Sequence, residues 1–82
     1  MRIEINEYIV IDSEICHGKA TFRDTRIMVS IVLEMLQGGA TTDEILEAYP
    51  SLTKKHIRAA LEFAAKVVGK NLLPIQDDIS NR

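Results

Sequence analysis

Residues 49–58 decide the fold of this chain, and they read Tyr49-Pro50-Ser51-Leu52-Thr53-Lys54-Lys55-His56-Ile57-Arg58. Pro50 disfavours the α-helical conformation of the residue before it, so a helix that reaches Tyr49 ends there. Thr53 can cap the next helix, because its hydroxyl can accept a hydrogen bond from a backbone N–H two or three residues later. The stretch therefore predicts a helix, a tight turn and a second helix.

The second helix begins with an unfavourable arrangement of charge. Lys54, Lys55 and His56 occupy its first turn, where the helix dipole favours carboxylates and each misplaced positive charge costs about 0.3–1 kcal/mol. A local rule that is broken without compensation often marks a site of function. For a helix-turn-helix, the anion met at this position is a nucleic-acid phosphate. For the two lysines alone, a solvated basic face is the alternative.

The size and composition indicate one small cytoplasmic domain. An 82-residue chain is near the lower end of what folds on its own core, and a homodimer would cover apolar surface that one copy leaves exposed. Cys16 is the single cysteine, which fits a reducing compartment. The N-terminal residues lack the apolar stretch of a signal peptide, and no run of 18 apolar residues predicts a membrane span.

The net charge of −2 combines two segments of opposite sign. Residues 28–49 carry four acidic side chains and no Lys or Arg, whereas residues 50–70 carry five basic side chains and one acidic one. Because the domain as a whole is not basic, strong non-specific DNA binding is not expected. A basic face on one helix is compatible with specific binding by a dimer.

The pattern along the chain predicts one strand and an extended segment before the helices. Residues 7–11 are β-branched and aromatic, which favours a short strand. Residues 20–28 alternate loosely and are expected to be extended, with a turn at Asp24. A two-stranded ribbon of this kind is marginal in water, so it should pack on the helices or on a second subunit.

Three helices are predicted after this segment, over residues 30–37, 42–48 and 54–68. Ser30 is the expected cap of the first, and the glycines at 38 and 39 end it. Thr41 and Glu44 have the spacing of a capping box at the start of the second. Gly69 is expected to end the third. The predicted fold is mainly α: a three-helix helix-turn-helix bundle (residues 1–69) preceded by a short strand and extended segment, with residues 70–82 as a tail.

The tail is more apolar than a solvated segment needs to be. Its apolar residues are Leu72, Leu73, Ile75 and Ile79. Two interpretations stay open: the tail packs back on its own domain, or it is an arm that grips a partner.

The cysteine, the histidines and the glycines of the chain do not have the spacing of a catalytic site or a metal site. Cys16 and His17 are neighbours in sequence, which is a poor placement for a nucleophile and its base. Together with His56 they show no metal-ligand spacing, and the glycines do not form a phosphate-binding motif. We expect no enzyme activity, no metal and no cofactor.

The candidate site is therefore a binding surface for DNA. Its predicted residues are Thr53, Lys54, Lys55, His56 and Arg58 at the start of the third helix. Arg58 can make a bidentate contact to guanine, while the lysines suit phosphate. A second basic cluster consists of Lys19, Arg23 and Arg26. It would add phosphate contacts or form salt bridges to Asp12, Glu14 and Asp24, and the structural role is favoured for Arg26 beside Ile27.

Five stretches of the chain resemble domain-of-unknown-function family 433. They are residues 12–19 with 25–30, residues 39–40, and residues 43–53 followed by Ile57-Arg58-Ala59-Ala60-Leu61. The resemblance covers roughly residues 7–65. Two departures stand out: the signature loop has Ala20 and Asp24 where the family usually has proline and glycine, and Lys54-Lys55-His56 replaces residues that tend to be acidic.

The resemblance implies a winged or strand-preceded helix-turn-helix domain of the VapB-like antitoxin type, encoded beside a PIN-like ribonuclease toxin. It implies that the helix opening at Thr53 binds operator DNA, that the C-terminal arm blocks the toxin, and that the loop with Gly18, Thr25 and Arg26 is the family's signature. Arg82 or Lys70 would then pair with carboxylates of the nuclease. The rival hypothesis is a dimeric protein-interaction module that does not bind nucleic acid, which the acidic second helix favours.

Overall fold

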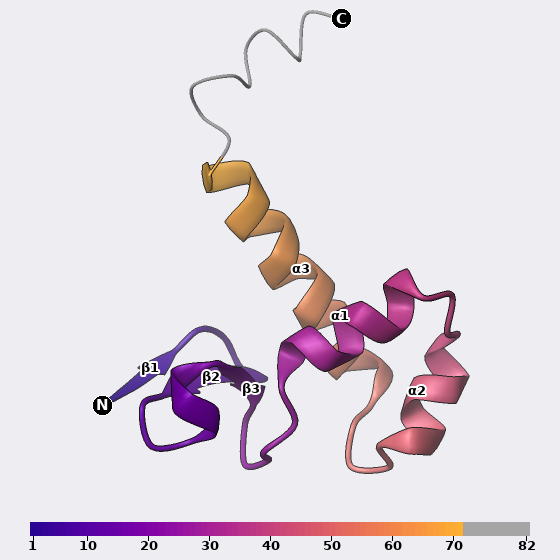
Figure 1. The fold of residues 1–82 in the computed structure, drawn as a ribbon, viewed down its shortest axis with the longest axis horizontal. Coiled ribbons are helices and arrows are strands. Elements are labelled where there is room, and N and C mark those ends of the chain that lie inside the picture. Colours follow the sequence, from indigo (N-terminus) through magenta and orange to yellow (C-terminus); the bar gives the residue numbers. More distant parts are fainter. Residues whose placement is uncertain (72–82) are drawn as a thin grey trace, which may run out of the picture.

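The computed structural model describes the backbone of residues 1–71, and the predicted tail residues Leu72, Leu73, Ile75, Ile79 and Arg82 lie outside the described part. A small sheet is followed by three helices (Figure 1). The elements are β1 (Arg2–Glu4), β2 (Ile9–Asp12), a short 3₁₀ turn η1 (Cys16–Gly18), β3 (Ala20–Phe22), α1 (Val29–Gln37), α2 (Thr42–Ala48) and α3 (Lys54–Asn71).

The predicted mainly α bundle with one short strand is wrong, because the N-terminal residues form a three-stranded antiparallel sheet of order β1-β2-β3. In its register Ile3 pairs with Ile11, and Val10 pairs with Thr21. β1 was missed because only one of its three residues, Ile3, is apolar, so alternation cannot be recognised in it. The predicted turn at Asp24 is present: Asp24 has φ +62°, and Thr21 forms an isolated bridge with Met28.

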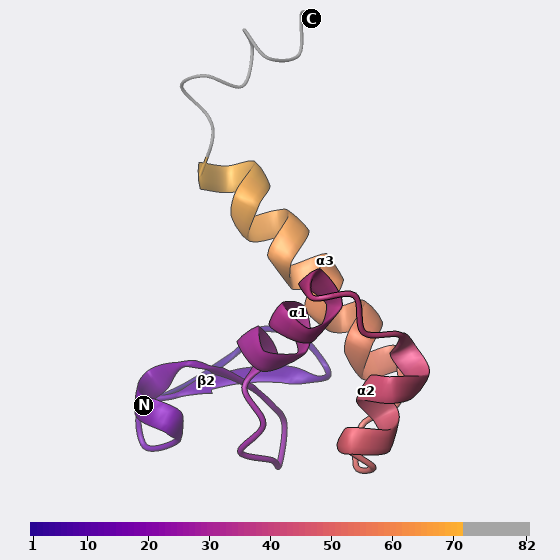
Figure 2. The same cartoon turned by 45° about the vertical axis from the view of Figure 1, so that its right-hand side comes forward.

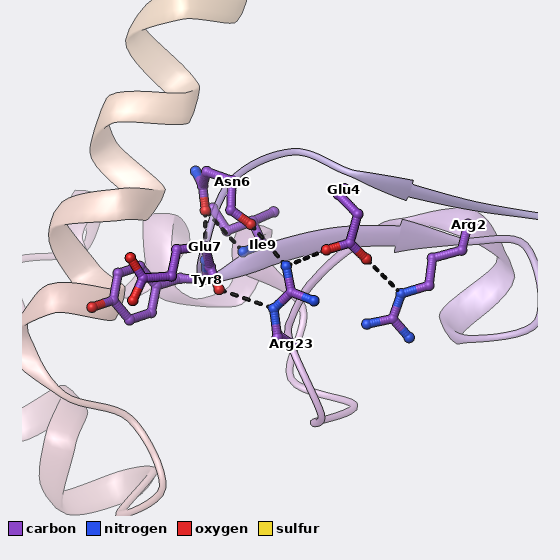
Figure 3. Close-up of polar contacts among 7 residues, drawn as sticks. All are labelled: Arg2, Glu4, Asn6, Glu7, Tyr8, Ile9 and Arg23. Carbon is purple, nitrogen blue, oxygen red and sulfur yellow. Dashed lines mark hydrogen bonds and ion pairs between the residues drawn. The ribbon is translucent and has the colours of Figure 1, made fainter.

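Side chains hold the connection between β1 and β2 in place (Figure 3). The Asn6 Oδ1 accepts hydrogen bonds from the backbone N–H groups of Tyr8 and Ile9, at 2.8 and 2.9 Å. Arg23 directly follows β3. Its guanidinium donates to the backbone oxygens of Glu7 (2.9 Å) and Asn6 (3.1 Å) and forms an ion pair with Glu4. A turn without regular pairing therefore keeps its backbone groups satisfied.

The core lies between one face of the sheet and the helices. Fully buried side chains come from the sheet, from α1 and α2, and from the first half of α3. They include Ile9, Phe22, Val32, Ile45 and Ala60, each 0% exposed. The first two are partners across β2 and β3, so their side chains point to the same face of the sheet.

The helices begin and end close to the predicted residues, with two corrections. The N-cap of α1 is Met28, which makes no side-chain cap hydrogen bond, so Ser30 is not the cap. α1 ends as predicted, because Gly39 has φ +96° and the N–H groups of Gly39 and Ala40 bond back to Leu36 and Met35. α3 continues to Asn71, so Gly69 does not end it.

α3 has two halves with different surroundings (Figures 1 and 2). Residues 54–60, here called the proximal half, pack among the sheet, α1 and α2. Residues 61–69, here called the distal half, rise away from the rest of the domain in both views.

Candidate nucleic-acid interface

α2, the turn at residues 49–53 and α3 follow one another at the place where a helix-turn-helix was predicted. The Leu52 N–H donates to the Tyr49 carbonyl at 3.0 Å, which closes the turn around Pro50. Leu52 itself is only 4% exposed and anchors the turn in the core. The direction of α3 is therefore fixed by a closed turn and a buried side chain rather than by a flexible linker.

The predicted capping box at the start of α2 is confirmed. The Thr41 Oγ1 accepts from the Glu44 N–H at 3.1 Å, and the Thr41 N–H donates to the Glu44 carboxylate at 2.8 Å. This backbone hydrogen bond, with the side-chain contact to Thr41, lowers the pKa of Glu44 below its ordinary value. The N-terminus of α2 lies beside the start of α3, since Thr41, Lys54 and Arg58 line one shallow hollow.

At the start of α3, a histidine occupies the place that glutamate has in a capping box. The Thr53 N–H donates to His56 Nδ1 at 3.0 Å, and the Thr53 hydroxyl lies 2.9 Å from the same nitrogen. An N–H can donate to Nδ1 only while that nitrogen is unprotonated. The arrangement therefore requires the neutral imidazole with its proton on Nε2.

His56 also packs edge-on against two aromatic rings of the sheet region. Its ring centroid lies 4.8 Å from that of Tyr8 and 5.6 Å from that of Phe22. Its burial lowers the pKa of His56 below the ordinary value of 6.5. The side chain thus docks the first turn of α3 onto the sheet and removes one positive charge from the end of the helix where positive charge is unfavourable.

The other three predicted basic residues, Lys54, Lys55 and Arg58, are exposed. Among the side chains of residues 1–69, ion pairs involve Arg2, Glu4 and Arg23 alone. Arg58 contributes to two neighbouring hollows, one shared with Lys54 and the other with Lys55. The three cations are therefore neighbours on the first turns of α3, and they are here called the basic surface of α3.

Acidic and polar residues that sequence reasoning did not select border this basic surface. Thr42 and Asp43 of α2 line the hollow of Lys54, and Glu7 and Glu62 line the hollow of Lys55. The capping box marked Thr42 and Asp43 as the first residues of α2, but their position beside α3 is decided by the tertiary fold. Glu7 was not recognisable, because only the tertiary fold brings the β1–β2 connection to this helix.

The second predicted basic cluster is dispersed. The guanidinium of Arg23 binds the β1–β2 connection, and its hydrogen bond, with that of Arg2, lowers the pKa of Glu4. Arg26 is exposed beside a hollow that also contains Arg2 and Asp24, while Lys19 lines a different hollow near α1. The hollows of the α3 basic surface include none of these three residues.

Cys16 and His17 lie in the η1 turn, and neither lines the hollows around Lys54, Lys55 and Arg58. Both have positive φ, +49° and +57°, and the Cys16 thiol donates to the Arg26 carbonyl at 3.4 Å. Across residues 1–71, His, Cys, Asp and Glu do not gather in groups of three that could hold a metal ion. In the same residues, every helix is too short or too polar to cross a membrane.

Two comparisons connect the chain to known proteins, while no curated protein matches it. The sequence profile described as "Protein of unknown function (DUF433)" matches residues 9–64. The crystal structure of a DUF433 member protein from Anabaena variabilis ATCC 29413 superposes with a TM-score of 0.69 and 32% sequence identity, over 93% of this chain and 71% of that one. The chain therefore belongs to the DUF433 family.

Proposed function

We propose that this protein is the antitoxin of a type II toxin-antitoxin pair, which binds operator DNA through α2 and α3 and neutralises a PIN-like ribonuclease. The DNA-binding part of the proposal rests on one observation. The second helix of a closed helix-turn-helix begins with exposed Lys54, Lys55 and Arg58, which form no ion pair with another residue of the described chain. In a helix-turn-helix, this end of the second helix meets the major groove.

Each cation suits a different part of the duplex. Arg58 lies one turn into α3, between the two hollows, and its planar guanidinium can contact a guanine edge through two hydrogen bonds. Lys54 and Lys55 are in the first turn and suit phosphate oxygens, which carry no sequence information. Neutral His56 would hold this turn on the sheet and would not itself contact the duplex.

The acidic border supports a selective binding mode. Asp43, Glu7 and Glu62 lie around the basic surface and repel phosphates that approach off register. A predicted homodimer would present two such surfaces to one duplex and would gain affinity without a strongly basic domain.

The antitoxin part of the proposal rests on the family resemblance. Its partner is a PIN-like ribonuclease encoded in the neighbouring gene, and the predicted contact is the apolar tail with Leu72, Leu73, Ile75, Ile79 and Arg82. The test is co-expression of this chain with the neighbouring gene product, followed by purification through a tag on one of them. A stable complex with suppressed ribonuclease activity supports the antitoxin function, and separate elution of two active proteins contradicts it.

The DNA test uses fluorescence anisotropy with the promoter fragment of the chain's own operon and a scrambled duplex of equal length, at several salt concentrations. Lys54→Ala/Lys55→Ala should weaken binding to both duplexes alike and reduce the salt slope by roughly 1–2. Lys54→Arg/Lys55→Arg keeps both charges and should retain the slope.

Arg58→Lys separates sequence readout from charge. It should keep the salt slope but lose roughly 1–3 kcal/mol of preference for the promoter, because lysine cannot form the bidentate contact. Equal slopes for the wild type and the double alanine variant would remove the DNA-binding proposal.

The exposed apolar residues of the distal half favour a second candidate function, a dimeric protein-interaction module without nucleic-acid binding. Leu61, Val67 and Val68 are 50%, 40% and 54% exposed, and such a concentration of apolar surface is typical of protein contacts. Stable complex formation with no DNA binding at any salt concentration would support this alternative.

A further inference from the structure

The outer edge of β1 is open for pairing with another strand. β1 is an outer strand of the sheet, and within residues 1–71 only β2 pairs with it. Its residues Arg2, Ile3 and Glu4 are all exposed. A free edge presents unpaired backbone N–H and C=O groups, and it is a template for a further strand.

The hydrogen bonds to β2 decide which backbone groups of this edge point outward. The Met1 carbonyl accepts from the residue after β2 at 2.9 Å, and the Ile5 N–H donates to the first residue of β2 at 3.0 Å. Ile3 between them bonds inward as well, because the bonding direction alternates along an antiparallel strand. The N–H and C=O groups of Arg2 and Glu4 therefore point away from the sheet.

One register of two antiparallel β1 strands satisfies these outward groups and also matches the charges. When Ile3 of one copy lies opposite Ile3 of the other, Arg2 of each copy lies opposite Glu4 of the other. Each of these pairs can exchange both backbone hydrogen bonds. A shift by one residue sets Arg2 opposite the inward-bonding Ile3. The next register in either direction sets Arg2 against Arg2 or Glu4 against Glu4, which is destabilising.

The same register covers apolar side chains on the helix-facing side of the sheet. Among residues 1–69, Met1 (87% exposed) and Ile3 (46% exposed) are the large exposed hydrophobic residues outside α3. Alternation places both on the face of Ile5, which packs against the core. In the paired strands Ile3 meets its own copy. Met1 lies opposite Ile5 of the other chain, beside the hollow that Ile5 lines with Phe63 and Val67.

We propose that the outer edge of β1 is a homodimer interface, in which the β1 strands of two copies pair antiparallel about Ile3 and join their sheets. Arg2 and Glu4 of one strand form an ion pair at 2.9 Å (Figure 3), so in the dimer the charges of the two copies alternate in sign around the two-fold axis. This self-complementarity selects a second copy of the chain as the partner.

The interface is separate from the basic surface of α3. None of the β1 residues lines the hollows around Lys54, Lys55 and Arg58. Pairing through β1 therefore does not depend on the proposed function, and sedimentation equilibrium of the full chain without DNA measures it.

A proline at position 2 tests the backbone pairing. Arg2→Pro removes an N–H that points outward, and proline is tolerated at such an edge position, so the pairing with β2 should remain. Arg2→Ala is the matched control, because it loses the same charge but keeps the N–H. The dissociation constant of the Arg2→Pro dimer should be about tenfold higher than that of the Arg2→Ala dimer, since a hydrogen bond is lost on each side of the two-fold axis.

A charge exchange tests the partner and the register. Arg2→Glu alone and Glu4→Arg alone each set like charges opposite one another, and each variant should dimerise about tenfold more weakly than the wild type. An equimolar mixture of the two variants should dimerise as the wild type does, because both cross-strand pairs are then of opposite sign. Circular dichroism of each variant confirms that it is folded.

Disulfide trapping in a Cys16→Ser background tests the two-fold axis. Two Ile3→Cys copies should form a linked dimer, because residues opposite one another in such a pair have Cα atoms about 4.5 Å apart. Two Arg2→Cys copies should not, because their Cα atoms would be about 8 Å apart, beyond the reach of a disulfide.

Three results would overturn the proposal. The first is a wild-type chain that is monomeric at every concentration measured. The second is a dimer that Arg2→Pro weakens no more than Arg2→Ala does. The third is a mixture of Arg2→Glu and Glu4→Arg that dimerises no better than either variant alone.

Discussion

The two halves of α3 are built from similar residues but meet different surroundings. In the proximal half Ile57 is 4% exposed and Ala60 is 0% exposed, whereas in the distal half Leu61 and Val68 are 50% and 54% exposed. The helix is continuous from one half to the other. Burial along α3 is therefore decided by what lies opposite each residue, not by its hydrophobicity.

The proximal half also combines two tasks on opposite sides. Ile57 and His56 pack toward the sheet and the core, while Lys54 and Arg58 remain exposed. In the distal half the exposed side includes Leu61 and Val68 as well as charged residues. This difference indicates that one end of α3 is suited to an anionic partner and the other to a protein surface. The following predictions test that distinction, from the largest expected effect to the smallest.

Truncation of one apolar side chain in each half gives the largest contrast. Ile57→Ala should lower the free energy of unfolding by roughly 2–5 kcal/mol, because it opens a cavity in the core. Leu61→Ala should lower it much less, because the Leu61 side chain is already 50% exposed. Urea denaturation measures both. Equal losses would show that the two halves do not differ.

Removal of the α2 cap tests whether the proximal half depends on its neighbour. Thr41→Ala should cost about 1 kcal/mol of unfolding free energy, because both hydrogen bonds of the capping box are lost. Thr42→Ala, one residue further along, is the matched control and should have a smaller effect. Thermal unfolding by circular dichroism compares them, and a larger loss for Thr42→Ala would contradict the assigned cap.

A glycine substitution tests the continuity of the distal half. Gly69 lies inside α3, and a Cβ there would meet no atom within 4 Å, so Gly69→Ala should stabilise the end of the helix by roughly 0.5–1 kcal/mol. Helicity measured by circular dichroism should rise. Gly39→Ala is the contrasting variant and should destabilise the protein, because Gly39 has φ +96°. Unchanged or lower helicity in Gly69→Ala would contradict a helix through this residue.

The smallest effect is a pH dependence that His56 gives to the proximal half. Because burial lowers its pKa in the folded state, its contribution is complete above about pH 6.5 and is lost as the pH falls from there toward the folded pKa. Unfolding free energy should therefore decrease between pH 7.5 and 5. The lowered pKa of Glu4 acts only below about 4.5 and does not contribute in this range.

His56→Gln should flatten this dependence, because glutamine can accept from the Thr53 N–H but does not titrate. His17→Asn is the control: His17 is exposed, and asparagine tolerates its φ of +57°. If the pH dependence of the unfolding free energy disappears in His17→Asn and persists in His56→Gln, it arises from His17 and the prediction is wrong.

Local sequence signals predicted the helices well. The capping box of Thr41 and Glu44 starts α2, and the glycines at 38 and 39 end α1. Both signals act on neighbouring residues, so the spacing along the chain was enough to predict these helix ends. β1 could not be predicted, because Ile3 is its single apolar residue and its identity as a strand depends on pairing with β2. The end of α3 was placed too early, because a glycine in helical conformation is only a weak breaker.

The candidate site was predicted in part for the same reason. The basic residues of the first turn of α3 were identifiable, because charge at a helix terminus is a local property. Two features of the site were not identifiable in the sequence, because they depend on residues that the fold brings together. His56 packs its ring against Tyr8 and Phe22 and does not join the exposed cations. Arg23 lies apart from the basic surface.

The sequence by itself determined the three helices, the turn at Pro50 and the cations that follow it, because capping, proline geometry and charge act over a few residues. Only the tertiary structure decided that the N-terminal residues form a three-stranded sheet, that His56 packs against it, and that Ile57 and Ala60 of α3 are buried while Leu61 and Val68 are exposed. Each of these depends on which distant residues stand opposite, and spacing along the chain does not contain that information.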